Sequence, residues 1–255
     1  MTVRATIAGL IAAAPFALLM SPLAEARDAP APAVAAALAD ASRPAADRDR
    51  DAARHPAELL AFAGIKPGMK VADFIMGGGY WTRLLSPLVG AKGKVYAYQP
   101  AEFIAYKASY GTDQEETAAA RANVVPRRES LADVAFPEPL DAIVTVQNYH
   151  DLHLKMSPPE FAGRTARRLF DALKPGGVLL VVDHVAMPDP GFALPDTLHR
   201  IDPAAARAEI EAAGFRFDGE SALLRQSGDP RTQLVFSPEI RGKTDQFVYR
   251  FRKPK

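Results

Sequence analysis

The stretch Val71-Ala72-Asp73-Phe74-Ile75-Met76-Gly77-Gly78-Gly79-Tyr80 joins an apolar run to three consecutive glycines. A helix-like segment, Trp81-Thr82-Arg83-Leu84-Leu85, follows at once. Glycines at such a turn allow positive φ angles and let a ligand approach the backbone, and the free N–H groups of the helix start point at the same place. The stretch therefore predicts a strand, a binding loop and a helix, with a nucleotide-like cofactor as the ligand.

Similar apolar runs recur along the chain with helical segments between them. The predicted strands are residues 71–75, 95–98, 124–125, 142–146 and 178–182. The predicted helices are residues 81–88, about 115–122, 159–173 and 203–213. This alternation is typical of a parallel, doubly wound sheet. Residues 215–224 and 245–252 are predicted to be two final strands, which form an antiparallel pair at one edge.

The first 26 residues have the pattern of a secretory signal peptide. Arg4 precedes an uncharged run from Ala5 to Leu23, and Ala24-Glu25-Ala26 places small residues at both cleavage positions. A transmembrane anchor is the alternative, but Pro15 and Pro22 and the high alanine content favour cleavage. The chain has no cysteine, which excludes disulfides and a thiol-linked lipid anchor. The pattern predicts an exported, periplasmic protein of a bacterium.

Three parts follow from the composition: the signal peptide at 1–26, an Ala/Pro-rich leader at 27–46 that we expect to be solvated, and one α/β domain at 47–255. The alternating charges of residues 47–54 indicate a solvated helix surface. With 24% charged residues and a formal net charge of +1, the chain has no basic excess for nucleic acid or anionic membrane. We expect a small-molecule substrate, no nucleic-acid partner, and no stable membrane insertion after signal cleavage.

The order of the motifs, over about Asp47 to Arg252, resembles class I S-adenosylmethionine-dependent methyltransferases. More narrowly, it resembles a group of exported predicted methyltransferases. After the glycine loop come residues 90–98, 140–144, 173–183 and 211–215, each with a pattern found in that family. The resemblance implies an α/β, Rossmann-like fold: a seven-stranded sheet, mostly parallel with an antiparallel last strand, and helices on both faces. It also implies S-adenosylmethionine as cofactor and methyl transfer as the reaction, with a methyl acceptor that the chain does not identify.

Matched position by position, the resemblance implies a cofactor site made of Asp73, Gly77, Gly78, Gly79, Gln99, Glu129, Ser130 and Asn148. Asp73 and the glycines correspond to the amino-acid end of the cofactor, and Glu129 or Ser130 to its adenine. Two positions depart from the family: Ile75 stands where another glycine is usual, and Gln99 replaces an acidic residue that accepts both ribose hydroxyls. Glu102 is close enough in sequence to substitute for that acid. A dinucleotide fold and a purely structural turn remain the alternatives for the glycine loop.

Four of the five histidines follow predicted strands. His150 and His153 come after the fourth strand, His184 after the fifth, and His199 precedes the next helix. Because ligands of open α/β sheets bind at the carboxyl ends of the strands, we expect these imidazoles to share one rim.

Two hypotheses account for this rim. In the first, His150, Asp151, His153 or His184 is a catalytic general base that takes a proton from the methyl acceptor. In the second, His150, His153, His184 or Asp183 binds a divalent metal, although a His-x-x-His pair is a weak ligand signature. The first is preferred, and no metal ligand is assigned. The alternative function is an exported protein of the same fold that has lost S-adenosylmethionine and binds another small ligand or a metal.

Overall fold

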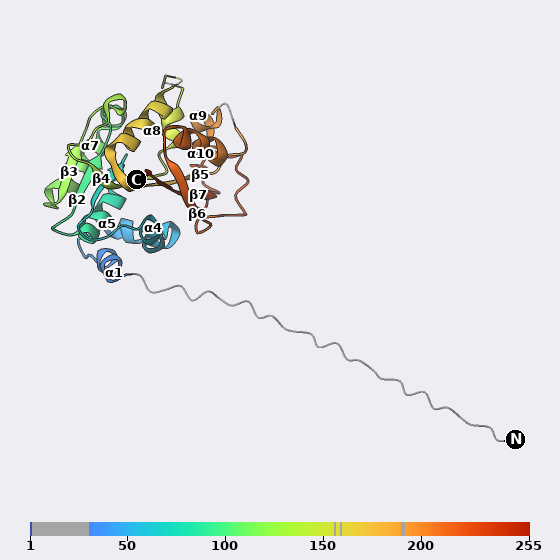
Figure 1. Cartoon of the computed structure of the whole chain (residues 1–255), viewed down its shortest axis with the longest axis horizontal. Helices are drawn as coiled ribbons and strands as arrows, with labels where there is room; N and C mark the ends of the chain where they lie inside the picture. Colours follow the sequence, from blue (N-terminus) through green and yellow to red (C-terminus); the bar gives the residue numbers. More distant parts are fainter. Residues whose placement is uncertain (2–30, 156, 159, 190–191) are drawn as a thin grey trace.

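Seven strands form one sheet at the centre of the computed structural model, in the order β3-β2-β1-β4-β5-β7-β6 (Figure 1). The strands are β1 (Lys70–Phe74), β2 (Lys94–Tyr98), β3 (Val124–Arg127), β4 (Leu140–Val146), β5 (Leu173–His184), β6 (Arg216–Ser221) and β7 (Gln246–Arg252). Strands β1 to β5 pair in parallel, whereas β7 is antiparallel to both β5 and β6. The fold predicted from the sequence is confirmed.

The structure describes Met1 and residues 31–155, 157–158, 160–189 and 192–255. The predicted signal peptide after Met1 and the first residues of the leader lie outside this range. Among the described residues, no helix has both the length and the apolar character needed to cross a membrane.

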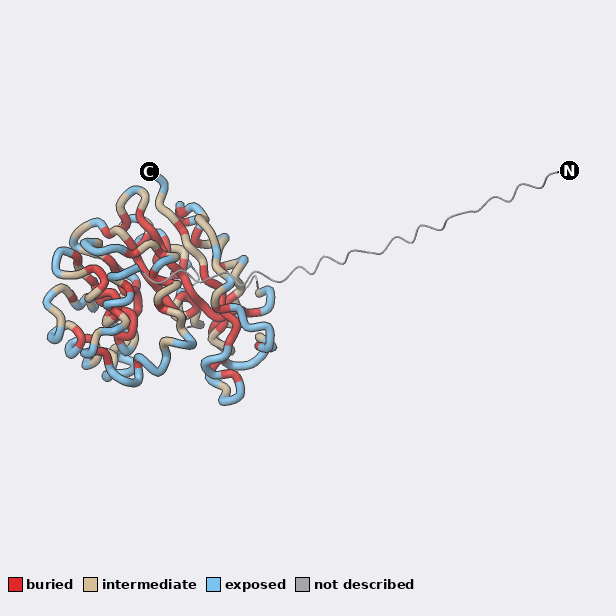
Figure 2. The backbone as a smooth tube through the Cα atoms, turned by 90° about the horizontal axis from the view of Figure 1, so that it is seen from below, coloured by how far each residue is buried: buried red, intermediate tan, exposed pale blue. Residues whose placement is uncertain are grey.

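Helices cover both faces of the sheet. They are α1 (Pro32–Leu38), α2 (Ala45–Arg48), α3 (Asp51–Arg54), α4 (Pro56–Ala63), α5 (Tyr80–Val89), α6 (Ala101–Tyr106), α7 (Ser109–Ala119), α8 (Phe161–Ala172), α9 (Leu194–Leu198) and α10 (Pro203–Ala212), with 3-10 turns η1 (Leu131–Asp133) and η2 (His150–His153). One core contains residues of α8 and α10, and the other contains residues of α1, α4 and α5. Because both faces are covered, the middle strands are apolar on both sides and buried (Figure 2).

The glycine loop lies at the topological switch point of the sheet. Strand β1 lies between β2 and β4, so the chain leaves β1 toward one side for β2 and later returns on the other side as β4. The loops after β1 and β4 diverge there and leave a crevice at the carboxyl ends of the strands. The topology thus places the three glycines at the same edge as His150 and His153, which follow β4.

Helix boundaries differ from the sequence prediction in the segment between β2 and β3. Helix α7 begins at Ser109 rather than near residue 115, and α6 was not predicted at all. This segment has a weak apolar periodicity, since helix α7 buries little more than Gly111, Gln114 and Thr117. Tertiary contacts such as the bonds from Gln114 Nε2 to the Ala97 and Arg127 carbonyls hold it instead.

The leader is a correction to the sequence analysis. Residues 27–46 were expected to be solvated, but Val34 and Ala37 of α1 are buried against α4 and α5. Arg43 is 1% exposed and forms an ion pair with Asp51. The small alanines let α1 approach the neighbouring helices closely. The folded domain therefore includes α1 and does not begin at Asp47.

Candidate functional site

The glycine loop after β1 has a left-handed backbone at three places. The φ angles of Ile75, Gly77 and Gly79 are 62°, 54° and 82°. Ile75 stands where the resemblance stated above implies a glycine, and it adopts the conformation that glycine favours, at a steric cost of about 1–2 kcal/mol. The substitution therefore leaves the turn in place and makes it strained.

Neighbouring strands hold this loop through two amides. The Gly77 N–H donates to Gln99 Oε1 over 2.8 Å, and Asn148 Nδ2 donates to the Ile75 carbonyl over 2.9 Å. Gln99 follows β2 and Asn148 follows β4, so the loop is fixed from both sides of the switch point. Both residues were assigned to the cofactor site from the sequence, and in the structure both lie against the loop.

A pocket of about 130 Å³ opens beside the glycine loop. It is lined by Arg50, Arg54, Ile75, Met76, Gly77, Gly78, Tyr80, Trp81, Val146, Gln147 and Asn148. Whole drug-sized ligands occupy roughly 300–1,000 Å³, so this hollow has room for one end of a nucleoside cofactor. Of the predicted cofactor residues, Gly77, Gly78 and Asn148 line it, whereas Asp73 and Gly79 do not.

Asp73 lies behind the loop rather than in the pocket. Its side chain is buried and accepts a bond from Thr82 Oγ1 at 2.7 Å, which ties β1 to the first turn of α5. Burial raises the pKa of Asp73 to about 6, and the bonds with Thr82 lower it only in part.

The raised pKa makes a testable prediction about pH. Between about pH 4 and pH 6 the folded chain keeps the Asp73 proton while the unfolded chain loses it, so this carboxyl makes folding less favourable as pH rises. The difference is on the order of 2–3 kcal/mol. Asp73→Asn retains the acceptor for Thr82 without the buried charge. We expect urea unfolding to show that the stability of Asp73→Asn relative to the wild type is higher at pH 7 than at pH 4, because the variant lacks the carboxyl that must ionise in the core. An equal difference between the two proteins at both pH values would contradict the assignment.

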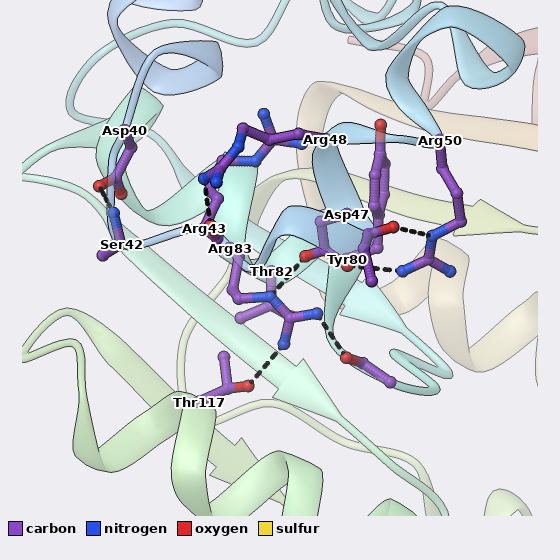
Figure 3. A network of polar contacts seen from close by, with 12 residues as sticks. Asp40, Ser42, Arg43, Asp47, Arg48, Arg50, Tyr80, Thr82, Arg83 and Thr117 are labelled. Carbon is purple, nitrogen blue, oxygen red and sulfur yellow. Dashed lines mark hydrogen bonds and ion pairs between the residues drawn. The ribbon is translucent and has the colours of Figure 1, made fainter.

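Polar contacts from α2 hold the loop from the N-terminal side (Figure 3). Asp47 is buried and pairs with Arg50 at 2.5 Å and with Arg83 at 2.6 Å. Arg83 also donates to the Gly78 carbonyl over 2.7 Å. The prediction that residues 47–54 form a solvated surface is wrong for Asp47, which is buried and paired with Arg83 far along the chain, whereas residues 48–50 are exposed as predicted.

The charged segment also supplies one cation without an acidic partner. Arg54 lines the pocket, lies 4.5 Å from the Tyr80 ring centroid, and reaches the Gln147 side chain at 3.5 Å. No described carboxylate forms an ion pair with it. Burial, with Arg50 nearby, lowers the pKa of Arg54. A half-buried guanidinium of this kind suits an anionic group on a ligand. Sequence reasoning missed it, since the charge run alone does not distinguish paired from unpaired members.

The residues predicted to contact the ribose and the adenine, Gln99, Glu129 and Ser130, follow β2 and β3 at the carboxyl ends of the strands. Gln99 is fully buried, and its Oε1 is used by Gly77 while its Nε2 has no partner among the described residues. The Glu102 carboxylate accepts from the Leu131 N–H at 3.1 Å and 3.2 Å. Tyr98 donates to the carbonyls of Glu129 and Ser130 over 2.9 Å and 3.0 Å. Gln99 thus offers a donor where the resemblance to methyltransferases implies an acceptor, and Gln99 Nε2 and Trp81 Nε1 are buried polar atoms without a partner in the described chain.

The loop geometry predicts opposite outcomes for two adjacent glycines. A Cβ on Gly79 would lie 2.6 Å from Arg83 Nη1 and 2.9 Å from Thr117 Oγ1, at a φ of 82°. A Cβ on Gly78 would meet nothing closer than 3.8 Å. We expect Gly79→Ala to lower the free energy of unfolding by about 1–3 kcal/mol and Gly78→Ala to leave it within about 0.5 kcal/mol. Chemical denaturation measures both, and equal losses would contradict the loop conformation.

Three of the four rim histidines meet at the ends of β4 and β5. His150 lies 6.1 Å from His184 and 5.3 Å from His199, measured between ring centroids. His150 Nδ1 bonds Asp183 Oδ1 at 2.7 Å, and Asp183 Oδ2 accepts the His150 backbone N–H at 2.8 Å. Burial lowers the pKa of His150, but the carboxylates of Asp183 and Asp151 outweigh it and raise the pKa to about 9.

His153 and His184, which were also predicted to be catalytic, each contact a residue of another segment. His153 Nε2 contacts Glu209 Oε1 at 3.1 Å, and its ring stacks on Phe192 with centroids 3.9 Å apart. His184 Nδ1 lies 2.8 Å from Thr244 Oγ1, and burial lowers the pKa of His184 to about 3. His153 is therefore apart from the other three, and both side chains are held within the fold.

Comparison with solved structures gives several proteins of the same architecture. One is an S-adenosylmethionine-dependent methyltransferase from Aquifex aeolicus, with 23% identity, a TM-score of 0.51, and coverage of 76% of this chain and 87% of that one. Another is the N-methyltransferase NodS from Bradyrhizobium japonicum, with 14% identity, a TM-score of 0.55, and coverage of 82% and 99%. A third, from Bordetella parapertussis, is described as a possible exported protein, with 19% identity, a TM-score of 0.50, and coverage of 82% and 68%. No family model matches the chain, and no curated protein is similar to it in sequence.

Proposed function

Because the chain has the class I methyltransferase fold, we propose that it binds S-adenosylmethionine at the glycine loop and transfers a methyl group to a small molecule. The observation that supports this most is Arg54, a half-buried guanidinium without an acidic partner in the described chain, beside the backbone of Gly77 and Gly78. A free amino-acid carboxylate is the end of the cofactor that this pocket suits in size and charge.

Each part of the site has a role in this proposal. Arg54 and the backbone of Gly77 and Gly78 bind the amino-acid end, and Asn148 keeps the loop open through its bond to Ile75. Gln99 Nε2 donates to a ribose oxygen, and the segment of Glu129 and Ser130 borders the base. Asp73 and Gly79 act indirectly, by fixing the start of α5. When bound, the cofactor supplies an electrophilic methyl group on a sulfonium.

The acceptor end of the site lies after β4. His150 and Asp151 are the catalytic residues that we propose there, since they follow Asn148 by two and three residues along the same rim. The bond that Asp183 Oδ1 accepts from His150 Nδ1 fixes the direction of the His150 ring. His153 and His184 position neighbouring elements through Glu209 and Thr244. Placing the acceptor oxygen or nitrogen close to the methyl group contributes much of the rate enhancement in such reactions.

We also propose that residues 1–26 are a signal peptide and that the methyltransferase acts in the periplasm. The Arg4-led apolar run and its cleavage site support this. The possible exported protein from Bordetella parapertussis, which has the same fold, supports it as well. Expression of the whole chain in a bacterium, followed by N-terminal sequencing of the periplasmic product, tests the cleavage after Ala26.

Calorimetry tests the cofactor proposal directly. The protein lacking residues 1–26 is titrated with S-adenosylhomocysteine, and we expect saturable binding of one equivalent. No heat at high micromolar ligand would overturn the proposal.

A binding protein without methyltransferase activity is the second candidate. Gln99 favours it, because its Oε1 is already used by Gly77 and no carboxylate stands there for the ribose hydroxyls. Native mass spectrometry of the purified protein distinguishes the two, since a different retained ligand supports the binding protein.

A further inference from the structure

His150, Asp151 and His199 form a compact group at the end of β4, next to but outside the lining of the glycine-loop pocket. We infer that these three side chains are the protein ligands of one divalent transition-metal ion. The inference deepens the proposed function at its acceptor end, because His150 and Asp151 belong to both, whereas metal binding itself needs none of the residues that line the cofactor pocket. His199 and Asp151 belong to different segments, so only the tertiary structure brings the set together.

The distances between the donor atoms suit a single ion. His150 Nε2 lies 3.2 Å from His199 Nδ1 and 3.3 Å from Asp151 Oδ1, and the third side of the triangle, from His199 Nδ1 to Asp151 Oδ1, is 3.8 Å. The circle through these three atoms has a radius of about 2.0 Å, and zinc lies about 2.0–2.2 Å from imidazole nitrogen and carboxylate oxygen. An ion therefore fits close to the plane of the three donors without movement of the backbone.

The His150 ring is held in the orientation in which its Nε2 can bind a metal ion. Its Nδ1 bonds the fully buried Asp183 carboxylate at 2.7 Å, so Nδ1 carries the hydrogen and Nε2 faces the other two donors. Metal-bound histidines usually donate their second ring nitrogen to a carboxylate in this way, which fixes the tautomer and increases the basicity of the ligand. Asp183 accepts two further bonds from the backbone N–H groups of His150 and His184, so it is itself held in place.

The backbone of His199 is also held without a metal. Its φ is 51°, in the left-handed region that a non-glycine residue occupies at a cost. The next two residues are anchored: Arg200 donates to the Val185 carbonyl at 3.0 Å, and Ile201 donates to the His184 carbonyl at 2.9 Å. His199 is the C-cap of α9, and these contacts hold its imidazole within 3.2 Å of the His150 ring.

The donor set decides the kind of ion. Two imidazole nitrogens and one carboxylate oxygen suit zinc, iron and cobalt, whereas magnesium and calcium prefer oxygen ligands throughout. The chain has no cysteine that could offer a thiolate instead. Three protein ligands leave at least one position for water or for a substrate oxygen, which is the arrangement of catalytic rather than structural zinc sites.

The test uses the metal alone, with protein that lacks residues 1–26 and carries no polyhistidine tag. After treatment with a chelator, the protein is titrated with Zn²⁺ by calorimetry and with Co²⁺ by visible absorption. We expect one equivalent of each ion to bind, with the intense cobalt bands of a four-coordinate site. Asp151→Asn and His199→Ala should each weaken Zn²⁺ binding at least 10-fold, and Asp183→Asn should weaken it by about 10- to 100-fold.

The matched control is His55→Asn, because His55 is the N-cap of α4 and its ring contacts Glu58 rather than a residue of the cluster, and asparagine tolerates its φ of 46°. Circular dichroism establishes that each variant is folded. Absence of stoichiometric Zn²⁺ and Co²⁺ binding would overturn the inference, as would equal binding by wild type and the Asp151→Asn/His199→Ala double variant. Because no nucleoside is present, a failure of S-adenosylhomocysteine binding leaves this result unaffected, and the two proposals are judged separately.

Discussion

Replacement of Arg54 by glutamine is expected to weaken the binding of S-adenosylhomocysteine by about 10- to 100-fold. Hydrogen bonds to a charged partner contribute about 1.5–3 kcal/mol, and the guanidinium has no described acidic group that already uses them. Its place in the pocket lining, beside Gly77 and Gly78, makes the ligand carboxylate the partner that is lost. Titration calorimetry of wild type and Arg54→Gln measures the change.

Two controls make this result specific. Arg164→Gln removes an exposed arginine that pairs with Glu160 on the surface, and we expect it to leave binding unchanged. The second control is the ligand 5′-methylthioadenosine, which has the nucleoside but no carboxylate. Wild type and Arg54→Gln should bind it equally. If Arg54→Gln binds S-adenosylhomocysteine as tightly as the wild type, Arg54 does not recognise the carboxylate.

Replacement of Arg200 by alanine is expected to lower the free energy of unfolding by about 3–5 kcal/mol, because it breaks a buried ion pair and leaves one charge without its partner. Arg200 is fully buried and donates to Asp229 at 2.7 Å and 2.9 Å. It also donates to the Gln233 and Val185 carbonyls. These bonds attach the long connection between β6 and β7 to the end of β5.

Urea denaturation at neutral pH measures this loss. The matched surface variant is Arg207→Ala, which removes an arginine that pairs with Glu211 while both side chains are more than a third exposed. We expect a change of no more than about 1 kcal/mol there. An Arg200→Ala loss as small as that of Arg207→Ala would show that Asp229 finds other partners.

The strands were predictable because each depends on a local pattern of apolar residues. The glycine loop was found for the same reason: an apolar run that ends in three glycines predicts a turn at which a ligand can approach. Ile75 was recognised as a departure, and the structure shows why it is tolerated, since its carbonyl is bonded by Asn148 and its side chain is buried. The two final strands were placed correctly as an antiparallel pair.

The N-terminal segment was not predictable in this way. Asp47 and Arg50 look like a solvated surface because neighbouring charges can pair with each other or with water. Arg50 is indeed exposed, but Asp47 is buried, and its burial depends on the ion pair with Arg83, 36 positions away in the sequence. Arg54 then becomes the pocket cation only because Asp47 and Asp51 are already paired with other arginines.

By itself, the sequence determined the sheet, the glycine loop after β1 and the gathering of histidines at one edge, because side-chain period, glycine conformation and strand direction are properties of short segments. Only the tertiary structure decided that Arg54 faces the pocket, that Gln99 Oε1 is used by Gly77, and that His199 meets His150 and Asp151 while His153 pairs with Glu209. These outcomes depend on which buried polar groups pair with each other in the folded state. The paired groups come from segments that only folding brings together.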